Sequence, residues 1–229
     1  MYKIRVYRAP DEEDTCKTYI EGHAKVLQDY GVTMITSYKP TWQHNPQVYC
    51  IIATDEKNEM VGGIRLHIAD EIVPLPMEDA ITKLDRGIHD LVKKYMKNGV
   101  GELCGLWNSK RVAGVGLSFV LTRAAISVIN QLKFSTLMGI CAEYSLQMFL
   151  DVGFKIDASL AKNGEFPYPT EEYITRVVGI LNTDSLATAK EYDKERMLGL
   201  RKAPIQIREE TGKKGNFLVS YDLTVYNKP

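Results

Sequence analysis

The sequence has no excess of charge of either sign. Its 229 residues contain 29 Lys and Arg against 29 Asp and Glu, so the formal net charge at pH 7 is zero. Proteins that bind nucleic acid or anionic membranes normally carry excess basic residues, so neither partner is expected. The sequence also lacks an apolar run near the ~20 residues that a membrane span needs. Because residues 1–5 open as a strand and not as a signal peptide, a cytoplasmic protein is expected.

Cysteine and histidine are scarce, with four residues of each. The histidines are scattered, and the cysteines have neither the spacing of a zinc site nor that of a redox pair. We therefore expect reduced, mostly buried thiols and no metal site; the cysteines are Cys16, Cys50, Cys104 and Cys141.

Hydrophobic patterning predicts strands and helices in alternation. A period of two marks strands, and apolar residues three or four positions apart mark helices. The expected elements, in chain order, are a strand at 2–7, a helix at 15–30, a hairpin of strands at 48–54 and 60–69, a helix or helix pair at 77–97, a strand at 101–107, a helix at 117–132, a strand at 134–142, a short helix at 144–150, a strand at 173–181, a helix from Asp184 or Ser185 to Leu200, and a hairpin of strands at 205–208 and 217–225.

The most distinctive local pattern is Arg-x-x-Gly-x-Gly at residues 111–116, between a predicted strand and a predicted helix. The start of a helix leaves backbone N–H groups unpaired and carries the positive end of the helix dipole, which together favour a phosphate or pyrophosphate. Gly114 and Gly116 would let such a ligand approach the backbone without meeting a Cβ.

This spacing, followed by an apolar helix, resembles the coenzyme-A-binding motif of the GNAT superfamily of N-acyltransferases. The order of elements over 2–181 is similar to that of the GNAT fold, and Val152-Gly153-Phe154 resembles the Leu-Gly-Phe that closes its fourth helix. The resemblance implies a mixed α/β fold, with a central mixed sheet, a splayed pair of parallel strands and helices on both faces. Residues 1–181 would form the acyltransferase core, and residues 182–229 a C-terminal extension, a helix and a hairpin, packed on the same domain.

Two segments also resemble acyl-homoserine lactone synthases within this superfamily. Residues 61–66 are similar to their Gly-Arg-Leu signature, and Glu102-Leu103 to their Glu-Leu signature. Those enzymes continue with Ser-Arg, whereas Cys104 and Gly105 follow here, and Trp42 is the only candidate for their conserved N-terminal set. We therefore take the resemblance as architectural and do not expect homoserine lactone as the product.

The resemblance also places a donor site. The pantetheine arm would lie between the strands at 101–107 and 134–142. The phosphates of the donor would lie on the loop at 111–117. The donor would be acetyl-CoA or another acyl-CoA, with an acyl-carrier protein less favoured. The donor-binding residues so implied are Leu106, Trp107, Asn108, Arg111, Val112, Ala113, Gly114, Val115, Gly116 and Leu117.

Acyl transfer to an amine needs a base, and Glu102 is the only ionisable residue inside the predicted central strand. Burial there would raise its pKa toward a useful range, although it could instead reach solvent or pair with Arg65. The tyrosine acid of many GNAT enzymes is replaced by Phe149, so Tyr144, Cys141 or water would protonate the leaving thiolate.

Two further side chains bear on the chemistry. Cys104 shares a strand face with Glu102, so an acyl-cysteine relay is conceivable, although a buried structural thiol is the simpler interpretation. Arg65 lies in an apolar strand, where it either faces solvent at a sheet edge or points inward toward an anion such as a substrate carboxylate. Trp42, in a predicted loop at 33–47, either covers the substrate pocket or anchors a surface loop.

Three functions remain open from the sequence. The favoured one is transfer of an acyl group, preferably acetyl, from acyl-CoA to a small amine, with Glu102 as general base. The second is a non-catalytic GNAT-fold protein that binds acyl-CoA and regulates or assembles, and the loss of the tyrosine at Phe149 supports it. The third is an enzyme similar to autoinducer synthases that uses an acyl-carrier protein. A homodimer is compatible with each.

Overall fold

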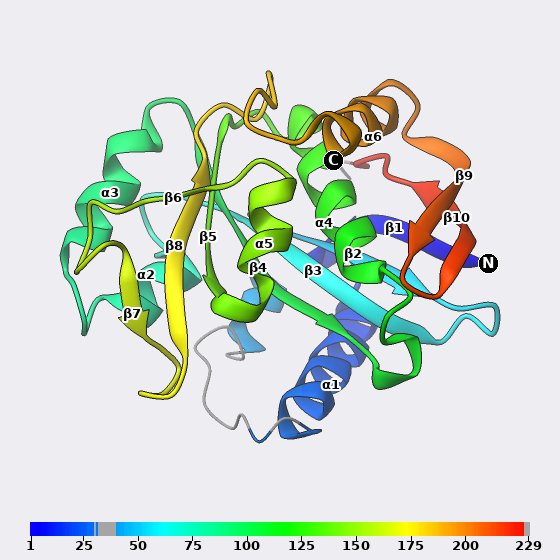
Figure 1. The fold of residues 1–229 in the computed structure, drawn as a ribbon, viewed down its shortest axis with the longest axis horizontal. Helices are drawn as coiled ribbons and strands as arrows, with labels where there is room; N and C mark the ends of the chain where they lie inside the picture. The colour runs from blue at the N-terminus through cyan, green and yellow to red at the C-terminus, as the bar shows by residue number, and fades with distance from the viewer. Residues whose placement is uncertain (30, 32–39, 227–229) are drawn as a thin grey trace.

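The computed structural model describes residues 1–29, 31 and 40–226. Over these residues the strands form one mixed sheet in the order β6-β8-β5-β4-β3-β2-β1-β10-β9, with β7 paired to β8 (Figure 1). The strands are β1 (Tyr2–Arg8), β2 (Val48–Thr54), β3 (Met60–Ile68), β4 (Val100–Asn108), β5 (Thr136–Ala142), β6 (Lys155–Ile156), β7 (Glu165–Pro167), β8 (Ile174–Ile180), β9 (Ile205–Gly212) and β10 (Gly215–Asp222).

Helices cover both faces of this sheet. Two adjacent glycines of β3 show this, because neighbouring residues of a strand face opposite sides. A side chain on Gly63 would meet Tyr19 of α1, whereas one on Gly62 would meet Leu121 of α4. The α-helices are α1 (Glu13–Asp29), α2 (Pro76–Ile81), α3 (Gly87–Met96), α4 (Leu117–Val128), α5 (Glu143–Asp151) and α6 (Glu191–Lys202); short 3-10 turns are η1 (Ala9–Asp11), η3 (Pro40–His44), η4 (Lys110–Val112) and η5 (Ile129–Gln131).

The predicted fold class is confirmed: the sheet is mixed, and β4 and β5 run parallel within it. The segment expected as a helix or a helix pair is the pair α2 and α3, and the short strands β6 and β7 were not predicted. The helix expected from Asp184 or Ser185 begins instead at Glu191. The reason is local, because the side-chain oxygen of Asn182 accepts hydrogen bonds from the N–H groups of Asp184 and Ser185 and so forms a turn.

The C-terminal hairpin extends the same sheet. β10 pairs in parallel with β1, where Tyr2 faces Val219. Its turn consists of Lys213 and Lys214, and its first strand is longer than the sequence predicted, since β9 reaches Gly212. The domain boundary expected between residues 181 and 182 is therefore not a break in the sheet.

A buried ion network connects this hairpin to α4 and α6. Arg123 of α4 contacts Asp193 of α6 at 2.7 Å and Glu210 of β9 at 3.3 Å. Glu210 also pairs with Arg196 at 2.9 Å and accepts a hydrogen bond from the Tyr221 hydroxyl at 2.9 Å. Because Arg123, Asp193 and Glu210 are all buried, their charges are compensated only within the network.

Candidate active site

The strands β4 and β5 separate along their length. They pair only over residues 100–102 and 136–138, although β5 stays paired with β8 as far as Ala142. β4 carries a bulge, because its residues 105–106 stand opposite the single β3 residue Ile64. Gly105 has φ +61°, a left-handed conformation that glycine adopts readily. The expected splay of the parallel pair is thus present, and a bulge accompanies it.

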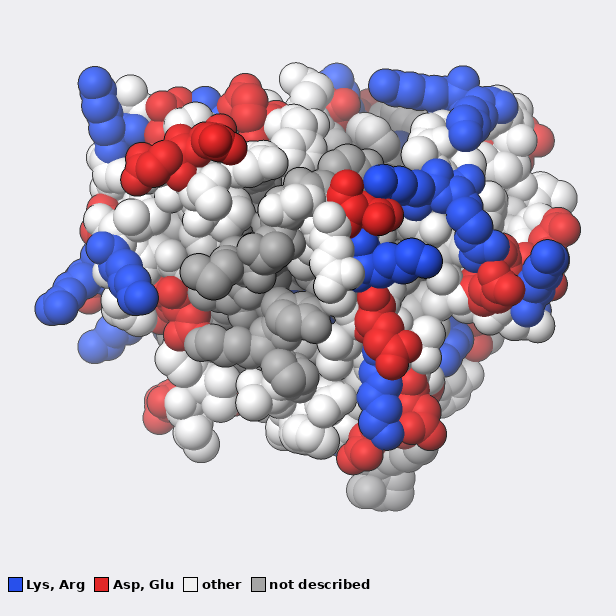
Figure 2. Space-filling model, turned by 90° about the horizontal axis from the view of Figure 1, so that it is seen from below, with Lys and Arg blue, Asp and Glu red and all other residues white. Residues whose placement is uncertain are grey.

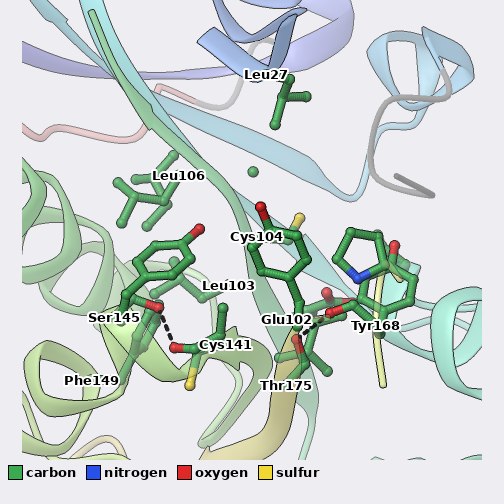
Figure 3. A pocket seen from close by; sticks show the side chains of 18 of the residues that line it. Leu27, Glu102, Leu103, Cys104, Leu106, Cys141, Ser145, Phe149, Tyr168 and Thr175 are labelled. Carbon is green, nitrogen blue, oxygen red and sulfur yellow. Dashed lines mark hydrogen bonds between the residues drawn. The ribbon is translucent and has the colours of Figure 1, made fainter. Parts of the chain in front are cut away.

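A cavity of about 230 Å³ lies in this gap (Figure 3). Its walls are largely apolar, and they come from elements far apart in the sequence. Leu103 and Leu106 belong to β4, Ile140 to β5, Phe149 to α5 and Leu27 to α1. The gap is therefore an apolar channel between two strands, with one edge of β4 not paired to β5.

Glu102 lies at the deep end of this cavity, where β4 and β5 still pair. Its side chain is only 1% exposed. Burial raises the pKa of Glu102 to about 8, although the Met77 N–H, which donates to its Oε2 at 2.7 Å, and the charge of Arg65 both act to lower it. The carboxyl group is consequently poised to exchange a proton near neutral pH.

Glu102 belongs to a strip of polar side chains on one face of β3 and β4. Arg65 stands opposite Cys104, and His67 stands opposite Glu102. Directly opposed residues of antiparallel strands place their side chains on the same face, so these four are neighbours. His67 was not predicted as a site residue from the sequence. Its position two residues after Arg65 in a predicted strand was the available signal.

Arg65 points inward, and the alternative of a solvent-facing position at a sheet edge is wrong. Its strand lies between β2 and β4, and the residue is 0% exposed. The guanidinium carbon lies 4.2 Å from the ring centroid of Trp42 and 5.8 Å from that of Tyr19. Trp42 is itself buried in η3; residues 32–39 of the loop predicted at 33–47 lie outside the described part of the chain.

A second cavity, of about 520 Å³, opens beside this strip. Arg65, His67 and Trp42 line it, together with the acidic residues Asp70 and Asp79. Pro76, at the start of α2, lines both this cavity and the one between β4 and β5. The two cavities therefore approach each other next to the cross-strand pair of Glu102 and His67.

The loop at 111–117 follows β4 and leads into α4. Val112 and Leu117 are buried in the core and fix its two ends. Gly114 and Gly116 have φ +77° and +102°, which other residues rarely adopt. At Gly116 the missing side chain also makes room for the C-terminal hairpin, because a Cβ there would lie 3.2 Å from the Gly212 Cα.

Basic side chains at this loop are engaged by carboxylates. Arg111 contacts Asp55 at 3.3 Å and Glu59 at 2.8 Å, both from the turn between β2 and β3. Lys110 lies 3.5 Å from Asp29. Figure 2 shows basic and acidic side chains interspersed over the described part of one face. A phosphate that uses Arg111 would have to compete with these carboxylates.

The three residues expected along the pantetheine differ in placement. Leu106 lines the cavity between β4 and β5. Trp107 faces α1, where its ring centroid lies 5.8 Å from that of Tyr19, so only its backbone could meet a ligand in the gap. The Asn108 amide hydrogen-bonds with the Ser118 hydroxyl in the first turn of α4 and thereby ties β4 to that helix.

Solved structures with a similar fold include two synthases of acylated products. FeeM, an N-acyl amino acid synthase from uncultured soil microbes, has a TM-score of 0.61 at 13% identity over 85% of this chain and 98% of its own. BjaI, a CoA-dependent acyl-homoserine lactone synthase solved with SAM and isopentyl-CoA, has a TM-score of 0.56 at 11% identity over 100% and 95%. ElaA of Escherichia coli has a TM-score of 0.54 at 7% identity over 78% and 99%. This chain has the GNAT fold. No protein-family model and no curated protein sequence matches it.

The side chains that could donate a proton at the cavity differ from those of many GNAT enzymes. Phe149, at the position of the tyrosine acid of many GNAT enzymes, packs edge-to-face against Phe154 at 5.1 Å. Tyr144 begins α5 at the cavity and is 85% exposed. Tyr168 and Tyr173 also line the cavity, and the sequence analysis missed them because the segment joining β7 and β8 folds back over the gap.

Two cysteines and His23 also line the cavity between β4 and β5. Burial raises the pKa of Cys104 and of Cys141 to about 12, so both are thiols at neutral pH and neither is a ready nucleophile. Burial, helped by the charge of Arg65, lowers the pKa of His23 to about 4, so this α1 side chain is neutral.

The described residues contain neither a metal-binding cluster nor a membrane-spanning helix. No cluster of three or more His, Cys, Asp or Glu side chains could hold a metal ion in this part of the chain. Within the same residues, no helix has the length and apolar character needed to cross a membrane.

Proposed function

We propose that this protein is an N-acyltransferase that moves an acyl group from acyl-CoA to the amine of a small acceptor. The observation that carries the proposal is the buried Glu102, with a pKa near 8, at the deep end of an apolar gap between two splayed parallel strands. The gap suits a pantetheine arm, whose amides would bond to the unpaired edge of β4. The fold neighbours FeeM and BjaI are named an N-acyl amino acid synthase and a CoA-dependent acyl-homoserine lactone synthase, and products of both kinds carry an acyl group, which supports the proposal.

The reaction needs one proton to be removed and one to be supplied. The acceptor nitrogen attacks the thioester carbonyl carbon, a C–N bond forms, and the C–S bond breaks. Glu102 takes the proton that the amine loses, and the CoA thiolate is protonated from water or from a side chain at the cavity. Tyr144, Tyr168 and Tyr173 are the candidate donors because all three line the gap.

CoA is the proposed donor because its phosphates would meet the helix N-terminus at the loop 111–117 and a basic group besides Arg111. That second basic group is Lys214, whose side-chain stem passes Gly114 with its Cε 3.4 Å from where a Cβ would stand. An acyl-carrier protein presents pantetheine without the adenosine phosphates, so it would make less use of this loop. Acetyl-CoA, isopentyl-CoA and longer acyl-CoA esters, compared with acyl-carrier protein bearing the same groups, would identify the donor and the acyl group.

The first prediction concerns this loop. Gly114→Val should weaken CoA binding at least tenfold, because a branched side chain at φ +77° distorts the loop and stands where the phosphates approach. Isothermal titration with CoA measures the effect. Gly31→Val is the matched control: Gly31 also has a positive φ, +72°, with no atom of the described residues within 4 Å of its Cβ position, and it is not part of the loop at 111–117. Equal affinity in both variants would remove the loop from the donor site.

The acceptor proposed for the second cavity is an amine that also carries a carboxylate. Arg65 supplies a buried cation there, and the proposal gains support from FeeM, which is named an N-acyl amino acid synthase. A hydrogen bond to a charged partner contributes about 1.5–3 kcal/mol, or roughly 10–100-fold in an equilibrium.

The second prediction follows from this pairing. L-Amino acids should react with kcat/KM about 10–100-fold higher than their decarboxylated amines, as for L-leucine against 3-methylbutylamine. Release of the CoA thiol measures both rates. Arg65→Met should reduce this preference toward one, with Arg5→Met as an exposed control at an arginine paired with Glu12. A preference that survives Arg65→Met would place the carboxylate elsewhere.

A non-catalytic role is the second candidate, and Phe149 at the usual tyrosine position favours it. A protein of this kind would bind acyl-CoA with the same loop but release no thiol with any amine. Thiol release from acyl-CoA with pooled amines therefore separates the two functions.

A further inference from the structure

The second cavity is lined by a histidine of which one ring nitrogen has no hydrogen-bond partner among the described residues. His67 is 6% exposed and lines the cavity beside Arg65. Its Nε2 is buried and has no hydrogen-bond partner among the described residues. Buried polar atoms in folded proteins are nearly always satisfied, so an atom of this kind in a cavity wall indicates a bound partner.

The surroundings of His67 define what it could bind. Burial, with a further contribution from the charge of Arg65, holds the pKa of His67 well below its ordinary value, so the ring is neutral and offers one donor and one acceptor nitrogen. The other ionisable groups around the cavity are His44, Arg65, Asp70 and Asp79, and across the strand pair is Glu102. A neutral ring offers a ligand in this cavity an acceptor nitrogen for an N–H group.

Position along the strip gives the orientation of a ligand. Arg65 and His67 are two residues apart on β3, so their side chains are neighbours on one face. His67 is the cross-strand partner of Glu102, which puts the imidazole at the end of the cavity nearest the reacting centre. A carboxylate held at Arg65 would therefore leave the amino group of a small amino acid near His67 and Glu102.

We propose that His67 binds the acceptor, through a hydrogen bond that the amino group of an α-amino acid in the second cavity donates to its Nε2. This inference rests on the proposed N-acyltransferase function. It assigns His67 to recognition of the acceptor, while Glu102 takes the proton. Two side chains of β3 then bind the two polar ends of the acceptor, Arg65 the carboxylate and His67 the amine.

Kinetics with the twenty standard L-amino acids, each tested as acceptor with acyl-CoA, provide the first test. His67→Leu should raise KM for the best amino acid at least tenfold and leave the Kd for CoA within twofold. His67→Gln, which keeps a hydrogen-bonding group, should recover part of the loss. Thr183→Val removes another buried, unsatisfied polar atom, away from both cavities, and should leave KM unchanged. An unchanged KM in His67→Leu overturns the inference.

Binding without turnover gives the second test and is measured on the wild-type protein. In wild-type protein labelled with ¹⁵N-histidine and saturated with CoA, the same amino acids should shift the His67 ring resonance. The resonance is assigned by its absence in His67→Gln. No shift with any amino acid that binds, or no binding of any amino acid, overturns the inference. Amino acid binding with a His67 shift but no thiol release contradicts the proposed function alone, and absence of CoA binding contradicts the donor site.

Discussion

Glu102→Gln is expected to lower kcat by about 10²–10⁴-fold, which is the usual contribution of a general base. The change keeps the size of the side chain and removes the carboxylate that accepts the amine proton. The Kd for CoA should stay within twofold, since Glu102 lies at the deep end of the gap and not at the phosphate loop. Thiol release and CoA titration measure the two quantities.

The pH dependence gives this prediction a sharper form. With the pKa of Glu102 at about 8, activity should rise about tenfold per pH unit below pH 8 and level off above it. The residual activity of Glu102→Gln should lack this step. His23→Gln is the control, because His23 lines the same cavity and is the other side chain that could accept a proton. If His23→Gln removes the step and Glu102→Gln keeps it, the base is His23.

Stability supplies an independent check of the same pKa. The folded value of about 8 lies above the ordinary Glu value of 4.5, so between these pH values the folded state binds a proton that the unfolded state has lost. The wild-type protein therefore loses stability as pH rises from 4.5 to 8. Because glutamine has no such proton, Glu102→Gln should gain stability relative to the wild type over this window, as urea unfolding at several pH values would measure.

Arg123→Met is expected to reduce the free energy of unfolding by about 3–5 kcal/mol, the range found when one partner of a buried ion pair is removed. Methionine fills much of the space but leaves Asp193 without its 2.7 Å partner, and Glu210 with Arg196 and Tyr221 only. Urea unfolding at pH 7 measures the loss.

A surface ion pair on the same part of the molecule provides the comparison. Lys190 contacts Asp151 at 2.8 Å, and the lysine side chain is 64% exposed. Lys190→Met should leave the free energy of unfolding nearly unchanged, because exposed pairs are screened by water. A loss below about 1 kcal/mol in Arg123→Met would mean that water or a rearrangement satisfies Asp193 and Glu210, and that the network does not hold the C-terminal hairpin.

The sequence predicted those parts of the fold that local patterning determines. β2 and β3 are rich in β-forming residues and are separated by a clear turn, α4 has apolar residues at helical spacing, and the Arg-x-x-Gly-x-Gly spacing located the loop. Glu102 could be found because a carboxylate inside an apolar strand is unusual. β6 and β7 were missed because two or three residues are too short for a period to be read.

The remaining features of the site depend on contacts between distant segments. The bulge at Gly105 shifts the alternation of β4, which is why Trp107 faces the same side as Cys104 and away from the expected ligand position. The Met77 N–H that bonds to Glu102 comes from a helix whose position the sequence does not specify. The cavity at His67 likewise needs η3 and the segment at 70–79 to be placed on β3.

The parallel pairing of β1 with β10 has a consequence for the order of folding. Tyr2 can meet Val219 only after nearly all of the described chain has been gathered, and closing so long a loop is entropically costly and slow. The hairpin of β2 and β3, formed by neighbouring segments, has no such delay. Because Gly212 of the late hairpin packs against Val115 of the loop at 111–117, that loop acquires its final surroundings among the last steps. If this loop binds CoA as proposed, folding of the central strands and acquisition of CoA affinity are separate kinetic events, with CoA affinity the later of the two.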